Sequence, residues 1–275
     1  MRAVLAVAQY EFQIGVRNRW VVLASIILFV FALLLVLLGS APTGATKADG
    51  LSVVVASLST LTVYLVPLIA LLLSYDAIAG EIDRGTLQLT LACPVSRSEV
   101  MLGKFLGHLL VLAIAISIGY GVAGGIGYYF GQNTGIAGLI DLGRLIATSI
   151  ALGGTFIAIG YVASASVRQT GTAAALAVAI WLFAVVLYDL ALLGALLVDP
   201  DGVFAKTVFP YLLLANPADA FRLFNLTTLD AGGSTGLTAG SGTMPVSTQL
   251  AILSPTIWTV TGLVVSCLIL RRVQP

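Results

Sequence analysis

The stretch EIDRGTLQLTLACPVSR, residues 81–97, lies between two long apolar runs of the sequence. The stretch is charged and contains glycine and proline, whereas residues 52–75 and 105–130 contain no Asp, Glu, Lys or Arg. A helix needs about 20 apolar residues to cross about 30 Å of hydrocarbon, and both runs are that long. The stretch is therefore predicted to lie at a membrane surface, between two spanning helices.

The composition of the whole chain favours a membrane protein. Of its 275 residues, 59% are hydrophobic and 9% are charged, whereas soluble domains carry about 25% charged residues. The apolar runs are continuous rather than alternating, which favours helices over the strands of a barrel. We expect an all-α integral membrane protein that forms one domain over residues 1–275 and lies in a lipid bilayer.

Six segments are predicted to span the membrane, and Lys and Arg set their orientation. With a cytoplasmic N-terminus, the inside segments hold nine Lys and Arg residues and the outside segments hold four. The positive-inside rule then places both termini in the cytoplasm. The predicted spans are Trp20–Gly39, Ser52–Tyr75, Phe105–Phe130, Leu145–Val167, Thr172–Val198 and Leu250–Leu270.

Two cytoplasmic segments lie outside the spans. Residues 1–19 place apolar side chains at helical spacing and predict an amphipathic helix in the headgroup region. Residues 76–104 predict a short helix that is broken at Gly80 and Gly85. After Pro94, the sequence Ser96-Arg97-Ser98-Glu99 is a capping box, so a new helix is expected to begin near Arg97.

The segment 199–249 is predicted to be extracytoplasmic. Its first part is too apolar for a free loop and too rich in proline for a span. Asn216-Pro217 is a good helix start, because asparagine is a frequent N-cap and proline suits the first helical position. We therefore expect short helices that cap the bundle between spans five and six.

Few residues offer chemistry of their own. The sequence has no G-x-x-x-x-G-K-[ST] phosphate loop, and a single histidine, His108, cannot assemble a metal site with scattered Met and Cys. We expect no metal and no cofactor in this chain, and the net charge of +1 gives no case for nucleic acid. Asp189 is the one acidic residue well inside an apolar run, and it is expected either to bond to a neighbouring helix near the outer interface or to have a role in transport.

Residues 75–108 resemble the loop between spans two and three in permease subunits of type-two ABC exporters. The shared elements are Glu81, Gly85-Thr86-Leu87, Pro94-Val95-Ser96-Arg97, Glu99 and Gly103-Lys104. The resemblance implies that this loop is a coupling helix docked on a separate cytoplasmic ATPase, which binds the ATP and Mg²⁺. The chain itself would then be a permease and not an enzyme. The expected coupling residues are Glu81, Asp83, Arg84, Gly85, Pro94, Ser96, Arg97, Glu99 and Lys104.

Nearly the whole chain resembles permeases of nitrous-oxide reductase maturation systems. The stretches that carry this resemblance are RAVLAVAQYEF (2–12), residues 75–97 and ANPADAFRL (215–223). It implies a homodimer in the bacterial inner membrane, with ATPase subunits and a periplasmic β-helical protein, that supports copper-site assembly during denitrification. The expected residues for periplasmic docking or an outer gate are Phe209, Pro210, Asn216, Pro217, Phe221 and Arg222.

Three functions remain open at this point. The first is a maturation permease that exports a cargo such as a sulfur species, or that passes ATP-driven motion to the periplasmic partner. The second is an ABC exporter of a lipid, a drug or a peptide. The third is a channel or carrier that needs no ATPase, and it would tolerate charge reversal at Glu81 and Asp83.

Overall fold

The computed structural model describes residues 2–39, 50–92, 95–130, 136–198, 202–228 and 248–272, and these ranges form helices and short connections without a strand. Five helical stretches are long and apolar enough to cross a membrane. Helix α1 (Arg2–Arg17) and helix α2 (Arg19–Gly39) meet at an angle of 67° and satisfy the same test as a pair. The prediction of an all-helical membrane protein is confirmed.

The predicted apolar segments correspond to observed helices. Helix α3 continues almost directly into α4, and α8 continues through a π-helical segment, η1, into α9. The remaining elements are α3 (Gly50–Ser74), α4 (Asp76–Asp83), α5 (Leu87–Ala92), α6 (Arg97–Phe130), α7 (Ile136–Ser166), α8 (Thr170–Trp181), η1 (Leu182–Leu187), α9 (Tyr188–Val198), η2 (Phe204–Val208), α10 (Phe209–Ala215), α11 (Pro217–Thr228), η4 (Thr248–Ile252) and α12 (Leu253–Arg272).

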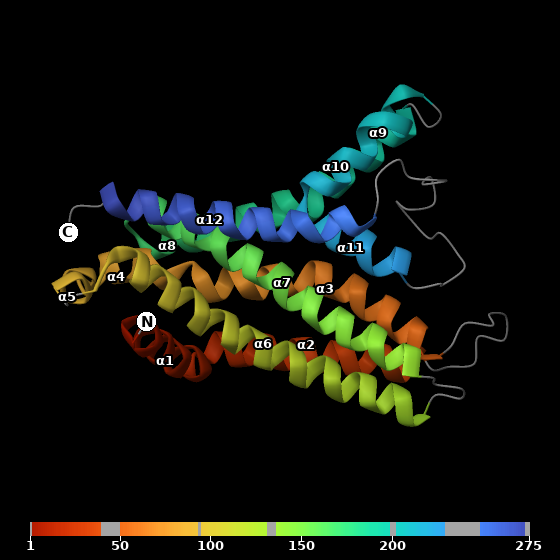
Figure 1. Cartoon of the computed structure of the whole chain (residues 1–275), viewed down its shortest axis with the longest axis horizontal. Helices are drawn as coiled ribbons and strands as arrows, with labels where there is room; N and C mark the ends of the chain where they lie inside the picture. The colour runs from red at the N-terminus through yellow and green to blue at the C-terminus, as the bar shows by residue number, and fades with distance from the viewer. Residues whose placement is uncertain are drawn as a thin grey trace.

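The long helices lie side by side as a bundle, with α7 packed against α3, α6 and α12 (Figure 1). Tyr120, Phe156 and Tyr161 are among the largest side chains that are fully buried in its core. The hydroxyl groups of Tyr120 and Thr62 are 2.7 Å apart, so a polar group within the bundle has a partner from another helix.

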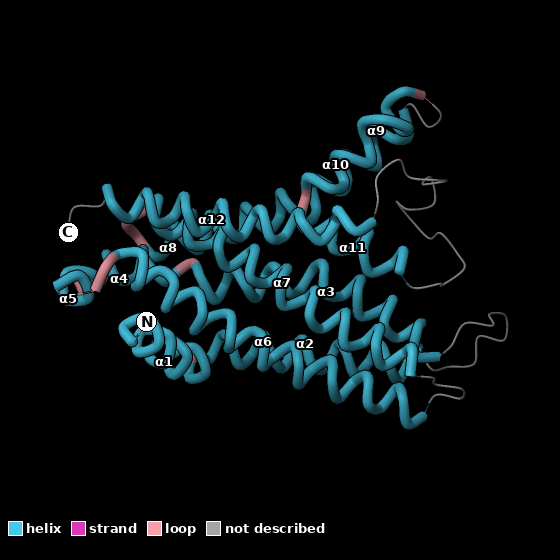
Figure 2. The backbone as a smooth tube through the Cα atoms, in the orientation of Figure 1, coloured by secondary structure: helices cyan, strands magenta, loops and turns pink. Residues whose placement is uncertain are grey.

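The two chain ends lie at the same end of the bundle as α4 and α5, and α9 and α10 project from the other end (Figures 1 and 2). Helices α10 and α11 bear out the expectation of short helices after the fifth apolar segment. Residues 199–201 and 229–247 of that predicted segment lie outside the described residues.

Helix α1 packs along the first half of α6. A Cβ atom on Gly107 would lie 2.7 Å from the carbonyl oxygen of Ala8 and 2.7 Å from Cβ of Glu11, so only glycine allows this close approach. The face of α1 that carries Glu11 and Gly15 is therefore buried against α6, whereas Tyr10 and Ile14 are exposed.

Candidate functional site

Helices α4 and α5 form a tip at the end of the bundle that holds both chain ends (Figure 1). The break between α3 and α4 at Tyr75 is held by Ser164 of α7. The Ser164 hydroxyl accepts the N–H groups of Ile78 and Ala79 at 3.0 and 2.9 Å and donates to the Tyr75 carbonyl at 2.6 Å. The first turn of α4 is thus fixed by a side chain from a different helix, a contact that the sequence analysis missed.

Helix α4 ends at Asp83, and the chain turns at Gly85, where a break was predicted. Gly85 has a φ of +69°, a left-handed conformation that favours glycine, and its N–H donates to the Ile82 carbonyl at 3.1 Å. The predicted break at Gly80 is wrong, because Gly80 lies within α4. The ion pair between Arg84 Nη1 and Asp76 Oδ2, 3.2 Å long, passes over Gly80, where a Cβ would lie 1.7 Å from Asp76 Oδ1.

The predicted capping box at the start of α6 is confirmed. The Ser96 N–H and hydroxyl donate to Glu99 Oε2 at 3.0 and 2.8 Å, and the Glu99 N–H donates to the Ser96 hydroxyl at 3.2 Å. Arg97 donates to the Leu270 carbonyl at the end of α12. These three predicted coupling residues therefore fix the start of α6, while Pro94 lies outside the described residues.

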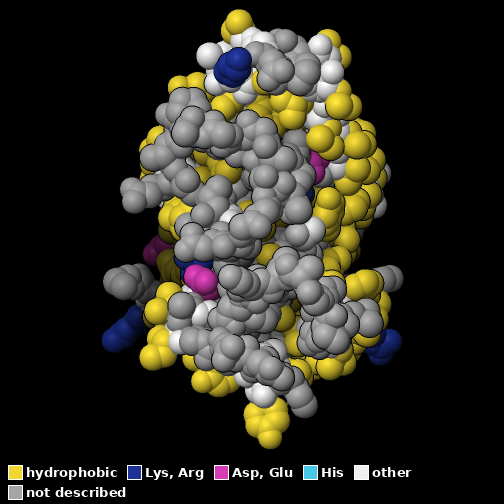
Figure 3. Space-filling view, turned by 90° about the vertical axis from the view of Figure 1, so that its right-hand side faces the viewer, with side chains coloured by type: hydrophobic (Ala, Val, Ile, Leu, Met, Phe, Trp, Pro, Cys, Tyr) yellow, Lys and Arg dark blue, Asp and Glu magenta, His cyan; other side chains and the backbone are white. Residues whose placement is uncertain are grey.

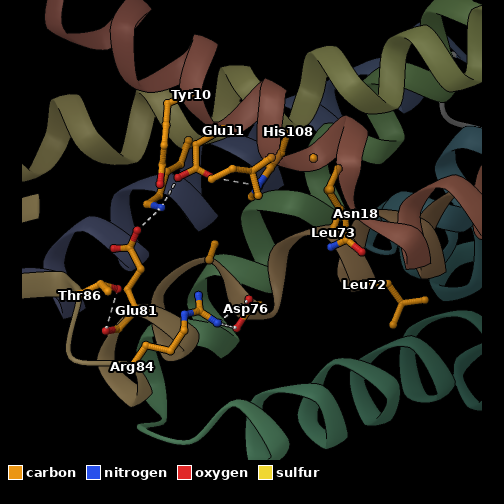
Figure 4. Close-up of a pocket in the computed structure, with 14 residues that line it drawn as sticks. Tyr10, Glu11, Asn18, Leu72, Leu73, Asp76, Glu81, Arg84, Thr86 and His108 are labelled. Atoms are coloured by element: carbon orange, nitrogen blue, oxygen red, sulfur yellow. Dashed lines mark hydrogen bonds and ion pairs between the residues drawn. The ribbon is translucent and has the colours of Figure 1, made fainter.

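A buried ionic cluster joins three helices at the base of the tip. The Lys104 ammonium of α6 donates to Glu11 Oε1 of α1 and, at 2.7 Å, to Glu81 Oε1 of α4. Lys104 is 3% exposed, so its charge is neutralised inside the protein rather than by water. Figure 4 shows Glu11 and Glu81 pointing toward each other across this cluster. We call Glu11, Glu81, Lys104 and His108 the inner cluster.

His108 extends the inner cluster toward the bundle core. Its Nε2 lies 3.4 Å from Glu11 Oε2, and its Nδ1 shares a hydrogen bond of 2.8 Å with the Tyr161 hydroxyl of α7. His108 therefore pairs with a neighbouring helix, α7. Polar contacts therefore run without a gap from α4 through α6 and α1 to α7.

A polar cavity of about 310 Å³ lies beside the inner cluster, lined by residues of α1, α3, α4 and α6 (Figure 4). Glu81 Oε2 is buried and has no hydrogen-bond partner among the described residues. A cavity of this size has room for water molecules, which can supply such a partner. Across this cavity, α1 and α4 are joined through the ionic contacts of the inner cluster.

Asp83 connects the tip to a fourth helix. Its Oδ2 accepts the Thr170 hydroxyl at 2.9 Å and the Thr170 N–H at 3.3 Å, at the first residue of α8. Asp83 thus acts as an N-terminal cap for α8, supplied from α4. The tip still offers an exposed surface of Arg84, Gly85, Thr86, Gln88 and Leu89, and Leu89 is 71% exposed.

Two of the predicted outer residues, Asn216 and Arg222, join a second buried cluster at the start of α11. Asn216 Oδ1 accepts the Ala218 N–H at 3.1 Å, so the predicted N-cap followed by proline is confirmed. Asn216 Nδ2 donates to the Ala184 carbonyl of η1 at 2.7 Å and to Asp219 Oδ2 at 2.9 Å. The amide therefore ties α11 to the π-helical segment.

Arg222 completes this outer cluster, which comprises Asp189, Asn216, Asp219 and Arg222. Its Nη1 lies 2.8 Å from Asp189 Oδ2 and 3.6 Å from Asp219 Oδ1, which confirms that Asp189 bonds to a neighbouring helix. Phe209, Pro210, Pro217 and Phe221 are buried, so they pack within the chain rather than face outward. Hydrophobic side chains predominate around the rim of this end of the bundle (Figure 3).

An apolar cavity of about 470 Å³ lies next to the outer cluster. Its walls come from α7, α8, η1, α12 and the junction of α10 with α11, and include Phe156, Phe183 and Trp258. The Trp258 indole donates to the Ala215 carbonyl at 2.9 Å, and the Tyr188 hydroxyl donates to the Leu212 carbonyl at 2.8 Å. The polar groups at its edge are thus satisfied, and its interior suits an apolar occupant.

Comparison with known proteins identifies the family. Residues 5–273 match the model of the ABC-2 family transporter protein. The chain is 38% identical over 274 residues to the probable ABC transporter permease protein NosY of Stutzerimonas stutzeri, which covers 99% of each chain. It is also 38% identical over 273 residues to the protein of the same name in Pseudomonas aeruginosa, again covering 99% of each. The chain therefore belongs to the ABC-2 family of transporter permeases.

Proposed function

We propose that the tip formed by α4 and α5 couples a cytoplasmic ATPase to this permease. The observation that carries the proposal is the way in which the tip is attached. Glu81 binds Lys104 of α6, Asp83 caps α8, and the first turn of α4 binds Ser164 of α7. A force on the tip would thus be passed to α6, α7 and α8. Helix α8 continues into η1, which contacts Asn216 of the outer cluster.

The attachment changes the role that we assign to the charged residues. Glu81 binds Lys104 inside the chain, and Asp83, although exposed, is bound to Thr170 of α8, so we assign to both the role of orienting the tip. The contact surface is instead Arg84, Gly85, Thr86, Gln88 and Leu89. An exposed leucine on the short helix α5 suits an apolar pocket of a partner, and nearby charges set the orientation of binding.

We further propose that α2 is a sixth span and that α1 lies at the cytoplasmic surface of the membrane. A bend of 67° lets α1 run along the surface while α2 enters the bilayer. Both termini lie at the end with α4 and α5, which would make them cytoplasmic (Figure 1). The residues of α8, η1 and α9 are the least buried of the candidate spans, and a second copy of the chain would cover this face.

The name that the relatives carry supports the role in nitrous-oxide reductase maturation. We propose that this homodimer works with the ATPase and a periplasmic β-helical protein on the copper sites of that reductase. The outer cluster ties α11 to η1, so motion of the fifth apolar segment would reach the outer face. Loss of reductase copper after deletion of this chain, restored by the intact chain, would support the role.

The apolar cavity favours one alternative, an ABC permease that exports an amphiphilic cargo such as a lipid. Such a permease would stimulate ATP hydrolysis when the amphiphile is added to the reconstituted complex. Absence of stimulation by a panel of phospholipids and detergents, with reductase copper still dependent on the chain, would favour maturation.

The coupling assignment is tested by Leu89→Asp. The substitution places a charge where we expect an apolar pocket of the ATPase, so the ATPase should no longer co-purify with the chain. Ile136→Asp is the matched control, because Ile136 is 79% exposed at the start of α7, at the other end of the bundle from the tip. Normal recovery of the ATPase with Leu89→Asp would refute the assignment of α5 as the docking element.

A further inference from the structure

An apolar groove runs along the junction of α1, α2 and α6 and has a volume of about 380 Å³. Its floor includes Val21 and Val111, which are buried, and its walls include Val22, Ile26 and Ile118, which are exposed. The one hydroxyl in its lining, that of Ser25, donates to the Val21 carbonyl at 2.8 Å. The groove thus offers no polar group that lacks a partner and suits a hydrocarbon chain.

Two arginines lie beside this groove, at the bend between α1 and α2. Arg17 ends α1 and Arg19 begins α2, and both are exposed. Neither forms an ion pair with a carboxylate among the described residues. Val16 and Val21, which lie close to them in sequence, both line the groove. A positive charge at the mouth of an apolar groove matches a molecule with an anionic head and a hydrocarbon tail.

We propose that the groove and the two arginines form a binding site for an anionic phospholipid. One acyl chain would lie between α2 and α6, and the phosphate group would bind Arg17 and Arg19 at the bend. Anionic lipid attracts basic side chains near the membrane surface, and the hydrophobic groove fixes where the molecule sits. The bend lies at the end of the bundle that carries the tip, so the site would open to the cytoplasmic leaflet.

The site would hold α1 in its place relative to α2. Because Glu11 of α1 also binds Lys104, a lipid at the bend stabilises the same helix that contacts the inner cluster. The proposal goes beyond the coupling function and does not depend on it, because lipid binding can be measured on the chain alone.

Native mass spectrometry of the purified full chain tests the proposal, with phosphatidylglycerol and phosphatidylcholine as probes. We expect tighter binding of phosphatidylglycerol. The double substitution Arg17→Gln with Arg19→Gln should lower that affinity about 25-fold, which is about fivefold for each arginine. Affinity for phosphatidylcholine, which has a phosphate group but no net charge, should fall much less. Arg271→Gln with Arg272→Gln is the matched control, since it removes the same charge from the end of α12.

Ala115→Phe tests the groove separately from the charge. Ala115 lines the groove on α6, and a phenyl group there would occupy the space of the acyl chain. Binding of both lipids should weaken while the preference for phosphatidylglycerol is kept. The proposal is overturned if wild-type chain binds the two lipids equally, if the α12 control has the same effect as the bend variant, or if Ala115→Phe leaves binding unchanged.

Discussion

The inner and outer clusters use similar residues but are charged differently. The inner cluster sets two carboxylates, Glu11 and Glu81, against Lys104 and His108. The outer cluster sets Asp189 and Asp219 against the single guanidinium of Arg222. The inner cluster adjoins a polar cavity of about 310 Å³, and the outer cluster adjoins an apolar cavity of about 470 Å³. The two ends of the bundle are therefore held by ionic contacts of different strength.

The difference appears in the acidity of the carboxyl groups outside the spans. Burial raises the pKa of Glu11, but the hydrogen bond from His108 and the charges of Lys104 and His108 outweigh it and lower the pKa to about 2. Burial and the nearby Asp189 carboxylate raise the pKa of Asp219 to about 7, although Arg222 opposes them. Glu11 thus stays ionised at neutral pH, whereas Asp219 of the outer cluster titrates near it.

Lys104→Met should give the largest loss of stability. It leaves Glu11 and Glu81 buried without a cation, and breaking a buried ion pair in this way costs about 3–5 kcal/mol. Thermal unfolding in detergent measures the effect, with Lys206→Met as the control because Lys206 is exposed on η2. Equal unfolding temperatures for the two variants would show that the inner cluster does not stabilise the fold.

Arg222→Met should lower the free energy of unfolding by about 2 kcal/mol, the usual effect of losing hydrogen bonds to a charged group. This loss is smaller than that expected for Lys104→Met. The reason is that Asp219 can take up a proton and so relieve the repulsion from Asp189. The loss should be larger at pH 8 than at pH 5.5. A loss that is independent of pH, or larger than that of Lys104→Met, would contradict the comparison.

Asp219→Asn should remove one contribution to the pH dependence of the protein's stability. Because the folded protein raises the pKa of Asp219 from 3.8 to about 7, this group's contribution to stability is full below pH 4 and is lost as pH rises to about 7. The wild-type unfolding temperature should therefore fall between pH 5 and pH 8 relative to that of Asp219→Asn. Asp141→Asn serves as control, since Asp141 pairs with Arg144 at 2.8 Å elsewhere. Parallel pH curves for wild type and Asp219→Asn would exclude this titration.

Asp83→Ala should have the smallest effect on stability, about 1 kcal/mol, the usual loss for a helix cap. Its carboxylate accepts two hydrogen bonds from Thr170, and it is exposed to water. Hydrogen exchange of the amides in the first turn of α8 would report the change locally. Unchanged exchange there would mean that Asp83 does not fix the start of α8.

Local signals in the sequence predicted much of the helical structure but few of its contacts. The capping box at Ser96, the turn at Gly85 and the start at Asn216-Pro217 depend on neighbouring residues, and all are found. The bond from Lys104 to Glu11 joins residues 93 positions apart, and the three bonds of Ser164 span 85, 86 and 89 positions. Nothing in helical periodicity pairs such residues, because their meeting depends on how whole helices pack.

The charged residues of the tip show the same limit. The motif predicted that Glu81 and Lys104 would meet the ATPase, and only the fold reveals that they bind each other. A residue that contacts a partner and a residue that orients a helix look alike in a sequence.

The most direct test is Glu81→Gln in the complex purified with its ATPase, with recovery of the ATPase and copper content of the reductase both measured. If Glu81 orients the tip through Lys104, the ATPase should be recovered in wild-type amount while reductase copper falls. Loss of the ATPase from the purified complex would instead place Glu81 in the docking surface and contradict the internal attachment. Wild-type values of both would show that the bond between Glu81 and Lys104 has no part in coupling.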